Sequence, residues 1–386
     1  MSESLRGSVA VVGTGLTKFG DLPGRSAREN LAEAAFRALA DAGINKNEVD
    51  GLFTSNFPDT FAALQTAEYL GIHPRVIDDS NIGGSVYVNQ LQHAAMAIKN
   101  GLCNVALIAM GSNTRSKLKQ TGVIDAPREK VLYFDEYKPR IPMNPYALAA
   151  ARHMYEYGTT RENMAEVAVS ARKWAQLNPR AMKRDTLTVE DVLNSPLICD
   201  PLSAADCCLI ADAGAAVVLV SAERAKSLHT NPAYLLGVGV HTTHSQIAQM
   251  PDLTTTAAKQ SGEHAFTMAG LTPADVDVVE LYDAFTINTI LFLEDLGFCP
   301  KGEGGRFVSN GNIAPGGGLP VNTNGGGLSC VHPGMYGAML IVECVEQLRG
   351  EGGDRQVKDA EVALCNGNGG HLSSQATAIF GTESTL

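Results

Sequence analysis

Two side chains in the last third of the chain have the types and settings for acid–base chemistry. His332 follows a run of glycines and precedes Pro333, in the segment NTNGGGLSCVHPGMYG. A lone His is more often structural, but an imidazole at a turn just before a helix is well placed to polarise a carbonyl oxygen. Cys365 is expected to end a strand and enter the turn NGNGG, where glycines let a substrate approach and a thiol can exchange a proton.

A third segment, ELYDAFT, joins an expected strand to an expected helix. Tyr282 can carry a proton there, and Asp283 is expected to cap the helix that follows. The ordinary pKa of a tyrosine is about 10, so a role for Tyr282 in proton transfer requires a relay or local tuning.

The fourth segment, SNIGGSVY at residues 80–87, is a glycine-rich turn between an expected strand and an expected helix. Enzymes with α/β folds often carry a nucleophile at such a turn, yet this one contains no Cys. Ser85 is the only hydroxyl at its centre, and no base accompanies it in the segment, so it is a weak nucleophile. We expect a nucleophile turn that has been emptied, with room for a substrate carbon.

The elements that position these segments follow an alternating pattern. Residues 8–13 and 49–55 read as strands, and residues 26–43 between them read as a helix. Ser26 and Glu29 form a capping box at its start, and Gly43 follows its end. Alternation of this kind predicts parallel strands covered by helices, in the α/β class.

The pattern occurs twice. Residues 42–53 and 269–280 have related sequences, and each is followed by a helix and then by a glycine cluster. We therefore predict two duplicated halves, residues 1–230 and 231–386, whose matching loops meet at a shared seam. An insertion at about 113–205, rich in Lys, Arg, Pro and Tyr, is expected to form a covering lobe in the first half.

Composition narrows the function. A net charge of -11 and the lack of a basic run argue against nucleic-acid binding, and no apolar run is long enough to span a membrane. The start of the chain has no hydrophobic signal region, so we expect a cytoplasmic protein. There is no CxxC pair, so no metal site is expected. Four cysteines in apolar settings are expected to be buried free thiols: Cys103, Cys199, Cys299 and Cys344.

Taken together, the motifs resemble the thiolase superfamily over essentially the whole chain. The resemblance implies a thiolase fold, with two βαβαβαββ halves in an αβαβα layering. VHP makes His332 the catalytic His of the family, and CNG makes Cys365 its acid/base Cys. YDAF, which begins at Tyr282, stands where the family has Asn-Glu-Ala-Phe. The position of the acylated Cys falls on Gly84, or on Ser85 if the alignment shifts by one.

These departures imply a particular reaction. Acyl transfer needs a thiolate that this chain lacks, whereas the His and Cys that handle a CoA-thioester enolate are kept. Segments HMYEYGTTRENMAEVAV and ADAGAAVVLVS are similar to sterol-carrier-protein thiolases, and YDAFT with HPGMYG is similar to the thiolase-like aldolases of steroid side-chain degradation. The resemblance implies retro-aldol cleavage of a bulky β-hydroxyacyl-CoA that releases acetyl- or propionyl-CoA. Those aldolases carry a Tyr where this chain has Cys330.

The resemblance also implies roles and partners. The catalytic residues would be His332, Cys365 and Tyr282, with Cys330 and Tyr336 as reserve proton carriers. The substrate is a CoA thioester, with no covalently bound cofactor and no metal. We expect a homodimer that buries strands of the first half, and a small OB-fold partner protein, often with a zinc ribbon. The residues expected to line the substrate are Gly84, Ser85, Asn324, Cys330, Tyr336 and Gly367.

Two other functions stay open on the sequence. One is a thiolase-type acetyl-CoA acyltransferase that uses Ser85 or another nucleophile. The other is a non-catalytic module that binds acyl-CoA or lipid, although such a module has no need of the proton carriers at 282, 332 and 365. His371, at the end of the last glycine turn, is expected to be structural.

Overall fold

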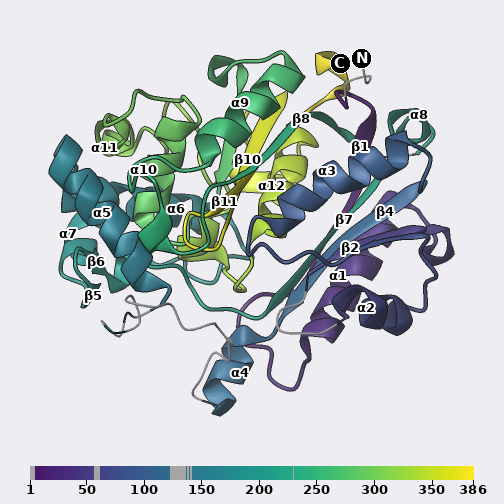
Figure 1. Ribbon diagram of the computed structural model, residues 1–386, viewed down its shortest axis with the longest axis horizontal. Helices are drawn as coiled ribbons and strands as arrows, with labels where there is room; N and C mark the ends of the chain where they lie inside the picture. Colours follow the sequence, from purple (N-terminus) through teal and green to yellow (C-terminus); the bar gives the residue numbers. More distant parts are fainter. Residues whose placement is uncertain (1–4, 56–60, 122–135, 137–138, 140, 229) are drawn as a thin grey trace.

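A computed structural model describes residues 5–55, 61–121, 136, 139, 141–228 and 230–386 (Figure 1). Within these residues, nine strands form one mixed sheet in the order β3-β2-β4-β7-β1-β8-β11-β10-β9. The strands are β1 (Val9–Leu16), β2 (Gly51–Thr54), β3 (Val76–Asp78), β4 (Val105–Ser112), β7 (Ala213–Ser221), β8 (Ala233–Thr242), β9 (Val278–Leu281), β10 (Val362–Gly369) and β11 (Ser374–Gly381).

The predicted duplication is visible in the strand order. The first half reads β3-β2-β4-β7-β1, and the second half reads β9-β10-β11-β8 with Val321 bridged in parallel to Val279 of β9, in the place that β3 takes beside β2. In the first half β4 pairs in parallel with β2 and antiparallel with β7. In the second half β10 pairs in the same way, in parallel with β9 and antiparallel with β11. A short antiparallel ladder between β1 and β8 joins the halves.

Helices cover and separate the two half-sheets (Figure 1). Helix α1 (Ala27–Ala42) packs on β1, β4 and β7, and α9 (Ala258–Ala269) packs on β8 and β11. Helices α3 (Val86–Lys99) and α12 (Gly337–Leu348) contact each other and strands of both halves, so they form a central layer. This arrangement confirms the α/β class and the αβαβα layering. In the part of the chain that is described, no helix is long and apolar enough to cross a membrane.

The outer helices lie close to the sheet because the strands beneath them present glycines. A Cβ built on Gly13 or Gly15 of β1 would stand 2.2 or 2.1 Å from a backbone oxygen of α1. Gly237 and Gly239 of β8 meet backbone oxygens of α9 at 2.1 and 2.2 Å in the same way. The same Gly-x-Gly spacing in β1 and β8 is a second sign of duplication. These glycines lie outside residues 42–53 and 269–280, the segments whose sequences are related.

Most local predictions are confirmed. Ser26 and Glu29 form the capping box of α1, and Gly43 ends it in the left-handed conformation. Helix α2 (Ala62–Leu70) and helix α10 (Thr286–Asp295) follow β2 and β9. Two expectations were wrong. β10 continues to Gly369, so Cys365 lies within a strand and not at its end. Cys199 is only partly buried, because it lies on a short strand of the insertion.

In Figure 1 the insertion lies mostly on the left, as a helical lobe, with its first helix apart at the bottom. It contains α4 (Thr114–Thr121), α5 (Met143–Tyr157), α6 (Arg161–Leu177), α7 (Val189–Leu193) and the hairpin of β5 (Leu197–Cys199) and β6 (Leu202–Ser203). Residues 122–135, within the predicted insertion, lie outside the described residues. Helix α6 packs on the glycine turn that precedes His332, so the lobe borders the site.

Candidate active site

The glycine turns of the two halves meet backbone against backbone. A Cβ on Gly83 would stand 2.6 Å from the amide nitrogen of Gly370, and one on Gly367 would stand 3.1 Å from the Cα of Ser85. A Cβ on Gly337, at the start of α12, would stand 2.4 Å from the carbonyl oxygen of Gly84. The loops of the two halves therefore meet at a seam at the N-termini of α3 and α12, which joins three of the four motifs, and Tyr282 adds the fourth.

Tyr282 lies at this seam and is 4% exposed. Its hydroxyl donates to the carbonyl of Gly334 at 3.1 Å and accepts from the amide of Tyr336 at 3.2 Å. Burial raises the pKa of Tyr282 well above its ordinary value, and the hydrogen bond from Tyr336 acts in the opposite direction. The phenol is therefore neutral at pH 7, and its oxygen has two fixed partners.

His332 stands edge-on to Tyr282, with ring centroids 5.3 Å apart. Its Nδ1 accepts the amide proton of Gly334 at 3.4 Å, and burial lowers its pKa to about 4. The imidazole is therefore neutral near pH 7, and with Nδ1 as acceptor its proton resides on Nε2. That Nε2 is buried without a hydrogen-bond partner in the described structure. A buried donor without a partner is costly, so it fits an oxygen supplied by a ligand.

Asp283 does not cap α10, contrary to the prediction. The N-cap position of that helix is occupied by Phe285, which makes no side-chain cap, and the Asp283 carboxylate accepts instead from the amides of Gly327 and Leu328 at 2.6 and 3.3 Å. Burial raises its pKa to about 7 despite these bonds. Asp283 therefore holds the turn Gly326–Cys330 that leads to His332.

The turn at Gly84 is not empty, which corrects the expectation of free room there. A Cβ on Gly84 would stand 2.3–2.5 Å from the Cε2, Oη and Cζ atoms of Tyr282. The phenol thus fills the volume that a side chain at this position would need. Ser85 is fully buried, and its hydroxyl donates to that of Ser374 at 3.1 Å and lies 3.4 Å from the carbonyl oxygen of Ile82. Neither of these partners among the described residues is a base that would activate Ser85 as a nucleophile.

Cys365 is fully buried and faces the central layer. It shares one face of β10 with Gly367, and its thiol forms a hydrogen bond with the thiol of Cys344 on α12. Glu280 is its neighbour across the β9–β10 ladder. The backbone connects Cys365 to the site, because the amide of Tyr282 donates to the carbonyl of Asn366, the residue after Cys365, at 3.1 Å.

Three of the predicted lining residues support the turn Gly326–Cys330 and the ring of His332. Asn324 accepts from the amide of Gly326 at 2.6 Å and from the hydroxyl of Tyr336 at 3.1 Å. Tyr336 stacks on His332, with ring centroids 5.9 Å apart. Cys330 is buried, its sulfur 3.5 Å from the side-chain amide of Asn178. These contacts give the three residues a supporting position around His332.

Two neighbours were missed from the sequence. The amide of Cys208 donates to the carbonyl of Ala284, beside Asp283, and burial together with the charge of Asp283 raises the pKa of its thiol. Tyr146 of α5 stacks on Phe285 and donates its hydroxyl to the carbonyl of Gly370. Each comes from a segment far away in the chain, and no local motif marks it. His371 lies edge-on to Tyr146, at the rim.

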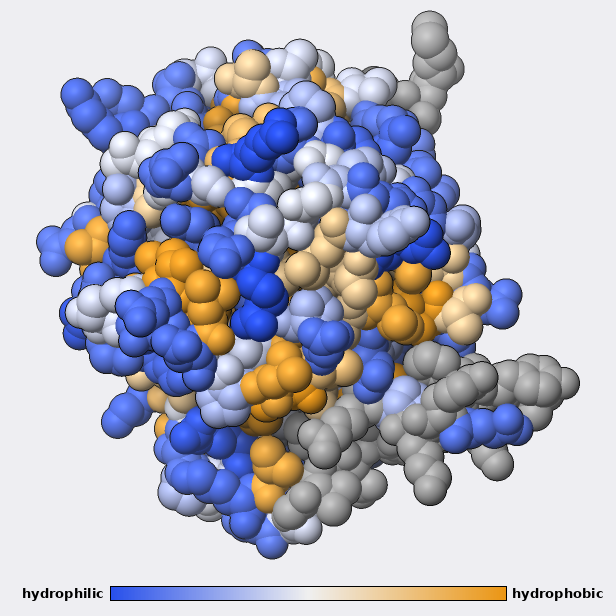
Figure 2. Space-filling view, turned by 90° about the vertical axis from the view of Figure 1, so that its left-hand side faces the viewer, coloured by the Kyte–Doolittle hydropathy of each residue, from blue (hydrophilic) through white to orange (hydrophobic). Residues whose placement is uncertain are grey.

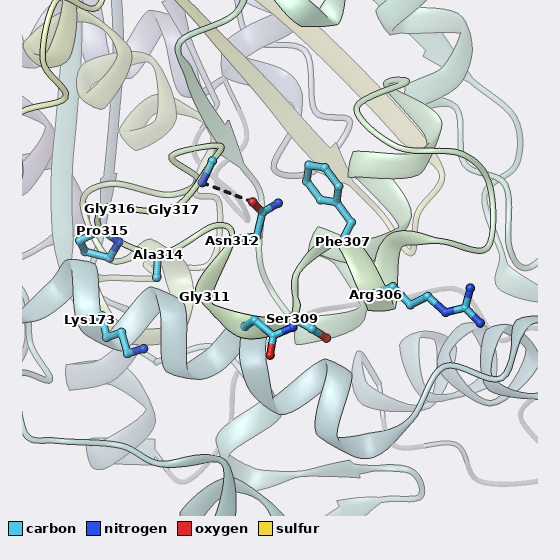
Figure 3. Close-up of a pocket in the computed structure, with 12 residues that line it drawn as sticks. Lys173, Arg306, Phe307, Ser309, Gly311, Asn312, Ala314, Pro315, Gly316 and Gly317 are labelled. Carbon is cyan, nitrogen blue, oxygen red and sulfur yellow. Dashed lines mark hydrogen bonds between the residues drawn. The ribbon is translucent and has the colours of Figure 1, made fainter.

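A surface pocket of about 650 Å³ lies elsewhere, around the loop 306–318 (Figure 3). Lys173 and Arg306 border it, but Arg306 is paired with Glu303 and the amide of Gly318 is bonded to Asn312. None of the motif residues lines this pocket, so its size does not make it the candidate site. In the described ranges, no group of three or more metal-ligating side chains is present.

Comparisons with known proteins identify the family of the chain. Residues 239–382 match the family model described as "Thiolase C-terminal domain-like". The acetyl-CoA acetyltransferase of Methanothermobacter thermautotrophicus is 37% identical over 96% of this chain and 99% of its own length. The chain belongs to the thiolase superfamily.

Two relatives in this superfamily are named for carbon–carbon cleavage. The steroid side-chain-cleaving aldolase of Thermomonospora curvata is 34% identical over 90% of this chain and 91% of its own. The 17-hydroxy-3-oxo-4-pregnene-20-carboxyl-CoA lyase of Mycobacterium tuberculosis is 36% identical over 90% and 92%. These names bear out the prediction of an enzyme.

Solved structures show the same thiolase fold. The structure named "Ltp2-ChsH2(DUF35) aldolase" superposes with a TM-score of 0.88 at 32% identity, over 100% of both chains. A monomeric SCP2-thiolase-like protein of Mycobacterium smegmatis superposes with a TM-score of 0.75 at 23% identity, over 99% of this chain and 78% of its own, and shows the fold alone.

Proposed function

We propose that this protein is a CoA-thioester carbon–carbon lyase, which cleaves a bulky β-hydroxyacyl-CoA by a retro-aldol reaction. The observation that carries the proposal is that a tyrosine ring stands where a nucleophilic side chain would stand, at the seam between the two halves. A phenol fills the side-chain space at position 84, while the unpartnered Nε2 of His332 remains available beside it. The site thus has a proton carrier and an oxygen-binding donor, but no acyl acceptor.

In the proposed reaction, the thioester oxygen accepts a hydrogen bond from Nε2 of His332. Tyr282, in the small fraction of molecules whose phenol has lost its proton, removes the proton of the β-hydroxyl. The carbon–oxygen bond becomes a carbonyl as the Cα–Cβ bond breaks, and its electrons pass into the thioester enolate. His332 stabilises the charge that develops on the enolate oxygen. A proton then returns to the α-carbon, which gives acetyl- or propionyl-CoA and a ketone or aldehyde.

Cys365 is our proposed donor of that last proton. Its support is its place on the face of β10 that carries Gly367, which adjoins the turn at Ser85. If Cys365 delivers the proton, C365A should slow the uptake of solvent deuterium at the α-carbon much more than it slows formation of the ketone. Equal loss of both would count against this role and favour a structural thiol paired with Cys344.

The bulky tail and the partner protein are inferred from the relatives. Two of them are named for steroid side chains or a steroid-derived CoA ester, and one solved structure pairs Ltp2 with ChsH2(DUF35). We propose a polycyclic or branched tail and a small OB-fold partner. Figure 2 shows apolar patches on the face that carries α5 to α7, where Leu148 and Leu197 are exposed. Such patches support a protein partner.

The test is product analysis with a β-hydroxyacyl-CoA that carries a polycyclic tail, with and without the purified OB-fold partner. Release of a short acyl-CoA together with a ketone or aldehyde, and no mass added to the protein, is the expected result. A stable acyl adduct after mixing with acetyl-CoA would instead indicate an acyltransferase, the activity named for the Methanothermobacter relative. No turnover of either substrate would favour a binding module.

A further inference from the structure

Gly84 is constrained by space and not by backbone conformation. The preceding residue, Gly83, has a φ of +75°, a conformation that favours glycine, but Gly84 is not among the residues with positive φ. A side chain at position 84 is therefore acceptable to the backbone. What excludes it is the ring of Tyr282, whose three nearest atoms lie within 2.5 Å of the position of a Cβ.

Tyr282 cannot easily yield that space. Its hydroxyl is held by the carbonyl of Gly334 and the amide of Tyr336, and its ring lies edge-on to both His332 and Tyr336. The phenol oxygen would itself lie 2.4 Å from a Cβ at position 84. The oxygen therefore occupies the start of α3, where the helix N-terminus favours a negative charge.

We infer that Gly84 and Tyr282 form a sterically coupled pair that fixes the type of reaction. The phenol oxygen takes the place that a nucleophile at the start of α3 would need, so a proton carrier and an acyl acceptor exclude each other there. A side chain cannot be added at position 84 while Tyr282 keeps its ring in place. This inference rests on the proposed function for its consequence, but the steric coupling itself is independent of it.

The inference predicts how acyl transfer can be installed. In G84C the introduced side chain meets the phenol, whereas in G84C/Y282N the shorter Asn leaves room. The introduced thiolate can then attack the carbonyl carbon of acetyl-CoA: a carbon–sulfur bond forms to the protein, the bond to the CoA sulfur breaks, and CoA leaves as the thiol after taking up a proton. His332 would hold the thioester oxygen in both reactions.

The steric coupling is tested by thermal unfolding, without any substrate. G84A in the wild-type background should lower the melting temperature by roughly 3 °C or more, since a methyl group is forced against a fixed ring. In the Y282N background the same change should cost much less. Y282F is the matched control, because it keeps the ring carbons that lie 2.3 and 2.5 Å from the Cβ position and should keep most of the loss. G337A is a second control, because its clash is with the backbone of Gly84.

Equal losses for G84A in the wild-type, Y282N and Y282F backgrounds would overturn the coupling. If G84A is insoluble, the comparison moves to solubility: recovery in G84A/Y282N but not in G84A/Y282F supports the pair, and no recovery in either rejects it.

The chemical consequence is tested by intact mass after mixing with acetyl-CoA. One acetyl group on G84C/Y282N, and at least tenfold less on G84C, is the expected result. Equal labelling of both variants, or of neither, would overturn the inference about reaction type. Failure of the proposed function gives a different pattern, in which the wild-type protein itself is acetylated while the unfolding comparison is unchanged.

Discussion

His332 is buried in its neutral form, and this has a consequence for stability. Its pKa falls to about 4 in the folded protein, against an ordinary value near 6.5. Between these values the unfolded chain binds a proton that the folded chain does not, so this residue makes stability rise with pH from about 4 to 6.5. Above that range its effect is constant.

We expect the wild-type protein to lose about 2 kcal/mol of stability relative to H332Q when the pH falls from 8 to 5, because Gln has no proton to take up. Urea unfolding of both proteins at the two pH values measures this. Parallel pH profiles would mean that the imidazole is not buried as the neutral form. Asp283 makes an opposite contribution, since its pKa is raised to about 7, but it is present in both proteins.

The raised pKa of Tyr282 predicts how the rate of the proposed lyase reaction depends on pH. The raised pKa leaves little phenolate at neutral pH, so kcat/KM of the lyase should rise with pH through the neutral and mildly alkaline range. Y282F should lower kcat by about 10²–10⁴-fold, the usual contribution of a proton carrier, and its residual rate should lack that rise. A pH profile of both proteins, with the same β-hydroxyacyl-CoA, is the measurement. A pH-dependent Y282F would assign the titration to another group.

The structure places together several residues that the sequence singled out within marked turns, whereas contacts between distant segments were not predicted. The glycine turns, VHP and YDAF indicated Tyr282 and His332 directly. The contact between Tyr282 and Gly84 was missed, because it depends on how the two halves pack, and so glycine was interpreted as free space. Cys208 and Tyr146 reach the site from other segments, and no spacing rule connects them to it.

At the scale of elements, alternation and capping signals predicted strands and helices well, because local hydrogen bonds and patterning determine them. Ser26, Glu29 and Gly43 are examples. The end of β10 was placed too early, because glycines and asparagines normally mark a turn. Here Asn366 and Asn368 remain in the strand, since their side-chain amides donate hydrogen bonds to the side chains of Gln375 and Tyr146, respectively. Tertiary partners thus overrode the local preference.

The glycines under α9 support a prediction about packing. G239A would place a methyl group 2.2 Å from the carbonyl oxygen of Ser261, so the helix must move away from β8. We expect a loss of about 1–3 kcal/mol in the free energy of unfolding. G262A, in α9 itself, is the matched control, because its new methyl meets only the flexible end of Leu296. Urea denaturation should show near-normal stability for G262A, and similar losses in both variants would contradict this account.

At the scale of the whole molecule, the two ends of the sheet differ. Val321 bridges to β9 and covers that edge, whereas no described strand pairs with the outer side of β3. Ile77 on β3 is 45% exposed, and Leu64 of the neighbouring α2 is 55% exposed. An open edge strand with apolar neighbours invites pairing with another chain. We therefore propose that two copies pair through β3, as the expected homodimer of first-half strands requires.

Charge at this edge should separate the copies. I77K would place a cation on each copy at the proposed contact, where like charges oppose each other, and the exposed position should tolerate Lys in the folded monomer. Light scattering at micromolar concentration should then give a dimer mass for the wild-type protein and a monomer mass for I77K. L197K, at an exposed position in the insertion, is the control and should remain dimeric. A wild-type monomer, or a dimer insensitive to I77K, would reject pairing through β3.

Because the halves meet within one chain, a monomeric I77K should also keep the contact between Gly84 and Tyr282.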